Sequence, residues 1–221
     1  MAAPTLKGKN LTWLVAALAF DAIVLWLVAS QAPVTELASA QSLAKRAALV
    51  TLLPVPALLL SSLLSSNLKA VLVFWRWQHP LPGARAFTVH APADPRVALD
   101  RLRKNIGEFP QDPREQNSRW YALYREVQAE ASVRDSHGQY LLFRDLAAVS
   151  LLLILAVPLV LLLAVTGATG IVLGTVAFFL AQYLLAAQAG RVAGVRMVRN
   201  VLALHASLKP APRARTTKTK K

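Results

Sequence analysis

The chain contains no cysteine, which excludes disulfide bonds, thiolate metal sites and a cysteine nucleophile. It is also poor in acidic residues, with 11 Asp and Glu against 25 Lys and Arg, for a formal net charge of +14. A basic excess of this size suggests nucleic-acid binding at first sight, but basic residues also collect on the cytoplasmic side of membrane proteins. The placement of the charges along the chain favours the second explanation.

Catalytic motifs are lacking as well. There is no Gly-rich phosphate loop, no Gly-x-Ser-x-Gly and no paired carboxylate motif. The residues at 135–137 are Asp, Ser and His, but neighbours in sequence rarely form a triad, which is defined by geometry. We therefore predict no catalytic residue, no cofactor and no metal site. The four histidines lack metal-ligand spacing: His79, His90, His137 and His205.

What the chain does have is long apolar runs. It is 55% hydrophobic, its mean hydropathy is +0.43, and runs of about 20 apolar residues are typical of transmembrane helices. We predict an all-α integral membrane protein with four transmembrane helices and a small helical cytoplasmic domain between the second and third. The parts are 1–75 with helices over about 11–30 and 47–75, a cytoplasmic domain over 76–145, a hairpin of helices over 146–190, and a basic juxtamembrane helix with a disordered tail over 191–221.

The positions of Lys and Arg predict the orientation. Basic residues occur before the first run, throughout 76–144 and after the fourth run, whereas 31–44 and the turn at 167–170 have none. Both termini and the middle region are therefore expected on the cytoplasmic side of the inner membrane, in a multi-pass arrangement. Lys45 and Arg46 are exceptions that the other basic residues outnumber.

A cleaved signal peptide is the alternative for the N-terminus. Lys7 and Lys9 would form its charged region, and residues 28–30 its cleavage site. Signal-peptide apolar regions, however, are about 7–15 residues long. This run is longer and contains Asp21, so a retained helix is favoured.

Asp21 lies alone in the middle of the first apolar run. An ionisable side chain at membrane depth costs about 2.5–3.5 kcal/mol on insertion scales, so it usually has a partner or a function. At a similar depth in the fourth segment lie Gln182 and Tyr183. These three residues are our membrane-embedded polar or gating candidates.

Proline and glycine mark two further features of the apolar runs. Pro54, Pro56 and Pro158 are hinge candidates, because each removes a backbone donor, although an ordinary kink is the simpler explanation. Glycines at four-residue spacing allow close helix packing against a neighbouring helix or another subunit. The helix-packing candidates are Gly170, Gly174, Gly190 and Gly194.

Helix signals recur in the cytoplasmic region. Asp94 followed by Pro95 is expected to open a helix that stops at Gly107, and Asp112 with Pro113 a second one, with Glu115 completing a capping box. An apolar stripe follows and is expected to be core: Trp120, Leu123, Tyr124, Val127 and Ala131. The second helix is expected to run past Gly138 directly into the third membrane segment.

Four residues are candidates for anchoring at the membrane interface. Two indoles flank a cation at Trp75, Arg76 and Trp77, and such amphipathic aromatics settle at the headgroup level. Arg144 lies at the cytoplasmic start of the third segment, where its long side chain can reach the interface.

These patterns lead to a functional hypothesis. We expect a small oligomeric channel or membrane-perturbing effector, gated by its cytoplasmic helical domain. The arrangement is similar to small membrane effectors of bacterial antiviral defence systems, an analogy of architecture alone. The alternative is a non-conducting scaffold that anchors or regulates a cytosolic protein partner. An enzyme or a transporter subunit ranks last, because a single central carboxylate provides few polar groups for catalysis or coupled transport. The expected partners are anionic lipids and further copies of the chain, and nucleic acid is not required.

Overall fold

The computed structural model describes residues 6–30, 48, 51–164 and 169–207. Within these ranges every regular element is a helix, so the all-α prediction is confirmed there. The chain divides into two compact units. The first comprises residues 1–81 and 134–194, and the second comprises 82–133 and 195–221.

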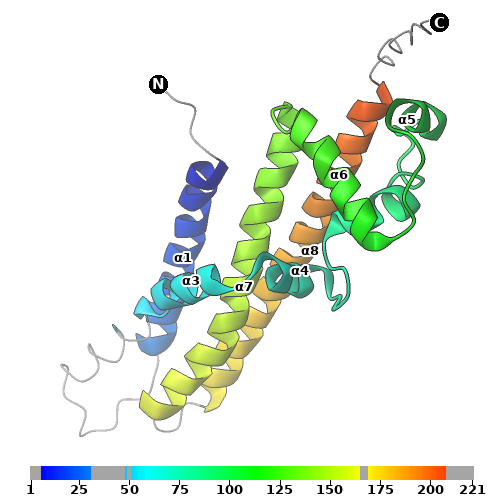
Figure 1. Cartoon of the computed structure of the whole chain (residues 1–221). Coiled ribbons are helices and arrows are strands. Elements are labelled where there is room, and N and C mark those ends of the chain that lie inside the picture. Colours follow the sequence, from blue (N-terminus) through cyan, green and yellow to red (C-terminus); the bar gives the residue numbers. More distant parts are fainter. Residues whose placement is uncertain (1–5, 31–47, 49–50, 165–168, 208–221) are drawn as a thin grey trace, which may run out of the picture. The chain divides into compact units, whose positions relative to one another are not determined.

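The first unit contains the apolar helices. They are α1 (Leu6–Ser30), α3 (Pro54–Leu63), α4 (Ser66–Phe74), most of α7 (Ala131–Ala164) and the first part of α8 (Thr169–Ser207). In Figure 1, α1, α7 and α8 run alongside one another, and α3 lies across the direction of α1. Buried apolar side chains from four helices form one core: Leu14, Leu18, Leu25, Ala57, Val149, Leu153, Val157, Leu161 and Phe179.

Among the described residues, three helices are long and apolar enough to cross a membrane, namely α1, α7 and α8. A fourth span exists only if α3 and α4 are counted together, since they meet at a bend of 111°. The segment predicted over 47–75 thus contains two helices at a sharp bend, and the count of four membrane-spanning helices is not confirmed. Long apolar helices of this kind are consistent with a membrane protein.

The bend lies at Leu64 and Ser65 rather than at a proline. Ser65 adopts an extended backbone and its hydroxyl accepts a hydrogen bond from the Leu68 amide at 3.2 Å, which starts a new helix. Pro54 instead begins α3, where a proline needs no amide partner, and Pro56 lies in the same first turn. Pro158 lies inside α7, which is helical on both sides of it.

The second unit comprises three short elements, α6 and the end of α8. It contains the 3₁₀ helix η1 (Pro82–Arg85), the π-helix η2 (Ala86–His90), α5 (Leu99–Ile106) and α6 (Pro113–Val127). The predicted stripe supplies part of its core, because Trp120, Leu123 and Tyr124 are buried, whereas Ala131 is exposed and begins α7. Gly83 lets η1 approach α6, since a Cβ there would lie 2.6 Å from the Trp120 ring.

The helix boundaries confirm some local signals and correct others. Asp112 caps α6 by accepting hydrogen bonds from the amides of Arg114 and Glu115, and Gly107 ends α5 with a φ of 87°. Asp94 does not open a helix, because its carboxylate binds Arg96 in a turn and α5 begins at Leu99.

The two long helices also differ from expectation. The helix that enters the third apolar segment does run through residue 138, but it starts at 131, after a break that follows α6. The fourth apolar segment and the basic helix after it are one continuous helix, α8. The segment 31–44, the first two residues of the turn at 167–170 and the tail after 207 lie outside the described residues.

Candidate functional site

Asp21 lies on the packed face of α1. The buried residues of this helix are Leu14, Leu18, Asp21 and Leu25, whose spacing of four, three and four residues defines one helical face. Asp21 is 0% exposed. The large side chains on the other faces, such as Trp13 at 69% and Phe20 at 56%, are exposed. The carboxylate therefore points into the helix cluster.

Gln182 on α8 is the partner that the structure gives Asp21. Its amide Nε2 donates to Asp21 Oδ2 at 3.2 Å. The other carboxylate oxygen, Oδ1, is buried and accepts no hydrogen bond from any described residue. A buried polar atom without a partner is costly, and a carboxylate oxygen more so than a neutral one. One oxygen of the Asp21 carboxylate therefore has a hydrogen-bond partner among the described residues, and the other has none.

The surroundings of the pair are mostly apolar. Leu18 and Leu25 lie one turn before and after Asp21 on the same face, and Phe179 lies one turn before Gln182 on α8. All three belong to the buried core of the first unit, which also contains Ala57 from α3. The hydroxyl of Ser61 on α3, which is also buried in this unit, has no described partner either.

Tyr183, the other predicted polar neighbour, lies elsewhere. Its hydroxyl donates to the Leu72 carbonyl at 2.8 Å and accepts from Trp75 Nε1 at 3.0 Å. Successive residues of a helix point about 100° apart, so Gln182 and Tyr183 cannot face the same neighbour. Tyr183 ties the end of α4 to α8 instead of completing the Asp21 site.

The predicted glycine pairs behave differently from each other. A Cβ on Gly194 would lie 2.9 Å from Phe74 Cζ, and one on Gly190 would lie 3.1 Å from Val73 Cγ1. These two glycines therefore allow α8 to approach α4 closely. A Cβ on Gly170 or Gly174 would meet no described residue within 4 Å.

The candidate anchors lie at two places in the first unit. Arg144 on α7 donates to Asp145 Oδ1, and the same oxygen binds Lys69 Nζ at 2.9 Å. Trp75 ends α4 in a left-handed conformation with φ 54° and is 55% exposed, and Trp77 is 85% exposed. Sequence reasoning did not identify Lys69, because a lone lysine in an apolar run gives no sign of its partner.

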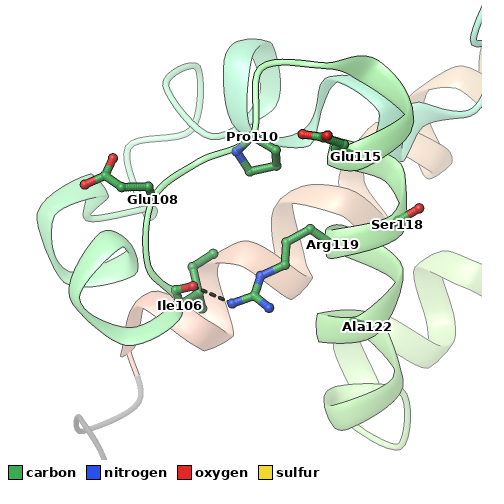
Figure 2. A pocket seen from close by; sticks show the side chains of 7 residues that line it. All are labelled: Ile106, Glu108, Pro110, Glu115, Ser118, Arg119 and Ala122. Atoms are coloured by element: carbon green, nitrogen blue, oxygen red, sulfur yellow. Dashed lines mark hydrogen bonds between the residues drawn. The ribbon is translucent and has the colours of Figure 1, made fainter.

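The second unit has an open hollow of about 490 Å³ between α5 and α6. Figure 2 shows two carboxylates at its rim, Glu108 and Glu115, and the side chain of Arg119 across it. The Arg119 guanidinium donates to the Ile106 carbonyl and holds the loop after α5. No group of three potential metal ligands occurs among the described residues.

Comparisons of the chain with protein-family models, with curated proteins and with solved structures found no match. Any functional interpretation therefore rests on the geometry of the residues described above.

Proposed function

We propose that the protein is an oligomeric integral membrane protein that acts as a channel or membrane-perturbing effector. Asp21 and Gln182 form the polar centre of its pathway, and the second unit controls opening. The proposed location is the cytoplasmic membrane, with both termini on the cytoplasmic side. The observation that carries the proposal is the fully buried Asp21 carboxylate, one oxygen of which lacks a partner.

The depth of the pair supports a role in permeation. Gln182 precedes Arg191 on α8 by nine residues (191 − 182), which is about 13 Å along an α-helix. If Arg191 lies at the headgroup level, the pair lies close to the middle of a hydrocarbon layer about 30 Å thick. Ionisable groups at that depth are typical of ion and proton pathways, and a carboxylate favours cations.

One contact supports the orientation inferred from the charges. Asn10 Nδ2 near the start of α1 donates to the Gly138 carbonyl in the first turns of α7, at 2.7 Å. The beginnings of these two helices therefore lie at the same end of the first unit. This agrees with a topology in which Lys7, Lys9 and the basic middle region share the cytoplasmic side.

Two features support gating and assembly. α8 belongs to both units, since the boundary falls after Gly194, so a movement of the second unit would act on the helix that holds Gln182. The face with Gly170, Leu173 and Gly174 has room for a second helix, because a Cβ on either glycine would meet no described residue within 4 Å and Leu173 is 66% exposed.

The test is ion flux through liposomes that contain the purified full-length protein. We expect a flux with the wild type that is lost in Asp21→Leu and reduced in Gln182→Leu. Thr175→Val is the matched control, because Thr175 is also buried on α8 but donates only to the Val172 carbonyl of its own helix. Equal flux from Asp21→Leu and wild type, at equal insertion, would contradict the proposal.

A non-conducting scaffold is the second candidate. The Asp21–Gln182 hydrogen bond joins two helices of the same chain. This favours a scaffold, because polar side chains also hold membrane helices together. In that case, Asp21→Leu would weaken helix association without altering flux. Recruitment of a cytosolic protein by full-length protein in membranes would then be the activity to measure.

A further inference from the structure

Arg191 on α8 is held in a fixed position at the end of α4. Its Nε donates to the Val73 carbonyl, and its guanidinium carbon lies 3.5 Å from the centroid of the Trp75 ring. Trp75 is itself fixed, because its indole N–H donates to Tyr183, whose hydroxyl donates to Leu72. A guanidinium fixed in this way loses little conformational entropy when it binds an anion.

The cation is nevertheless incompletely satisfied. Arg191 Nη2 is buried and has no hydrogen-bond partner among the described residues, and the same is true of Nη1 of Arg76, the residue that follows Trp75. Neither arginine forms an ion pair with a described carboxylate. Both side chains are partly exposed, although these two nitrogens are themselves buried. One of the two cations stacks on the Trp75 ring and the other follows Trp75 in the chain, which favours an anionic ligand beside Trp75.

The chemistry of the site indicates which anion. The planar guanidinium presents paired donors that match a phosphate group. Trp75 and Trp77 are exposed indoles that flank Arg76 in the chain, and indoles settle at the level of the lipid headgroups. Basic pockets between membrane helices on the cytoplasmic side bind anionic headgroups.

We propose that Arg191, stacked on the Trp75 ring, and Arg76, the next residue in the chain after Trp75, form a binding site for the phosphate of an anionic phospholipid headgroup. The site rests on the membrane location proposed above, but it does not depend on conduction. It also differs from general attraction to an anionic surface, because it requires two particular arginines and the Trp75 ring.

The test is native mass spectrometry of the full-length protein in detergent, titrated with phosphatidylglycerol and, separately, with phosphatidylcholine. We expect wild type to retain phosphatidylglycerol preferentially. Arg191→Gln and Arg76→Gln should each weaken that retention at least about tenfold, because a hydrogen bond to a charged group is lost. Arg191→Lys keeps the charge but loses the planar guanidinium that stacks on the Trp75 ring, so this variant should also bind the lipid more weakly than wild type.

Arg101→Gln is the matched control, since Arg101 is an exposed arginine on α5 and its replacement removes the same charge. Equal retention in wild type, Arg191→Lys, Arg191→Gln and Arg76→Gln would overturn the site. Inorganic phosphate that displaces the lipid at comparable concentrations would overturn the lipid assignment and identify a site for free phosphate. Circular dichroism on each variant identifies any that has not folded.

Flotation with neutral phosphatidylcholine vesicles, measured on the same preparations, tests membrane insertion separately. A protein that fails to float contradicts the proposed membrane location. A protein that floats but shows no arginine-dependent lipid preference overturns only the phosphate site.

Discussion

Lys69 on α4 and Asp145 on α7 form an ion pair, with Nζ 2.9 Å from Oδ1, although 76 residues separate them in the chain. The lysine side chain is only 8% exposed, and Arg144 binds the same carboxylate oxygen at 3.0 Å. One carboxylate thus satisfies two cations and joins the second half of the bent helix pair to α7.

The first prediction concerns the two cations that share the Asp145 carboxylate. Asp145→Ala leaves a buried ammonium without a partner and should lower the free energy of unfolding by about 3–5 kcal/mol. Lys69→Met leaves Asp145 bound to Arg144 and should cost clearly less. Unfolding in mixed detergent micelles measures both. A larger loss for Lys69→Met would show that the lysine is not the cation that depends on this carboxylate.

The second prediction separates the two glycine pairs. Gly194→Leu should destabilise the chain by at least about 1–3 kcal/mol, because even a Cβ there meets Phe74 at 2.9 Å and Tyr140 at 3.1 Å. Gly174→Leu should leave the melting temperature of the chain nearly unchanged and reduce cross-linked oligomers. Thermal unfolding and cross-linking of both variants in detergent test this prediction. Similar melting temperatures for the two variants would contradict the packing described.

The third prediction concerns Gln116, a buried side chain of α6. Its Oε1 accepts from the Phe87 amide at 3.1 Å and from the Thr88 amide at 3.2 Å. Gln116→Leu leaves these donors unpaired and should cost about 1–3 kcal/mol or more. Exposed Gln128→Leu is the control and should change stability by less than about 0.5 kcal/mol. Equal losses in chemical unfolding would show that the buried bonds contribute little.

The fourth prediction concerns pH. Burial, followed by the charges of Arg199 and Arg85, lowers the pKa of His90 from 6.5 to about 4. Because the folded pKa lies below the unfolded one, the unfolded chain takes up the proton first. Stability from this group is complete above about pH 6.5 and is lost as the pH falls to about 4.

The melting temperature should therefore fall between pH 7.5 and pH 5, and His90→Asn should reduce that fall. His79→Asn, at an exposed histidine, serves as the control. A fall of the same size in wild type and His90→Asn would rule out His90 as the cause.

Local signals predicted helix ends well where the chain itself supplies the partner. Asp112 caps α6 because the amides that it accepts from belong to the next residues, and Gly107 ends α5 because it can adopt a positive φ. Asp94 and Pro95 carry the same sequence signal, but Arg96 competes for the Asp94 carboxylate with two hydrogen bonds. That competition is not visible in a capping pattern.

Contacts between distant segments were harder to predict. Depth along the chain placed Gln182 and Tyr183 equally near Asp21, and only the rotation of α8 decides that Gln182 faces it. Likewise, glycine spacing is the same in both pairs, yet only Gly190 and Gly194 lie against another helix. The bend at Ser65 escaped prediction because the two prolines before it are accommodated in the first turn of α3.

The most direct test of the central claim is the current across a planar lipid bilayer that contains the purified full-length protein, with a KCl gradient. We predict a conductance whose reversal potential is shifted from zero toward the equilibrium potential of potassium. We also predict that this conductance is lost in Asp21→Asn, which keeps the shape of the side chain and removes its charge. Stable insertion of the wild type with no conductance, or an undiminished, equally cation-selective current in Asp21→Asn, would contradict it.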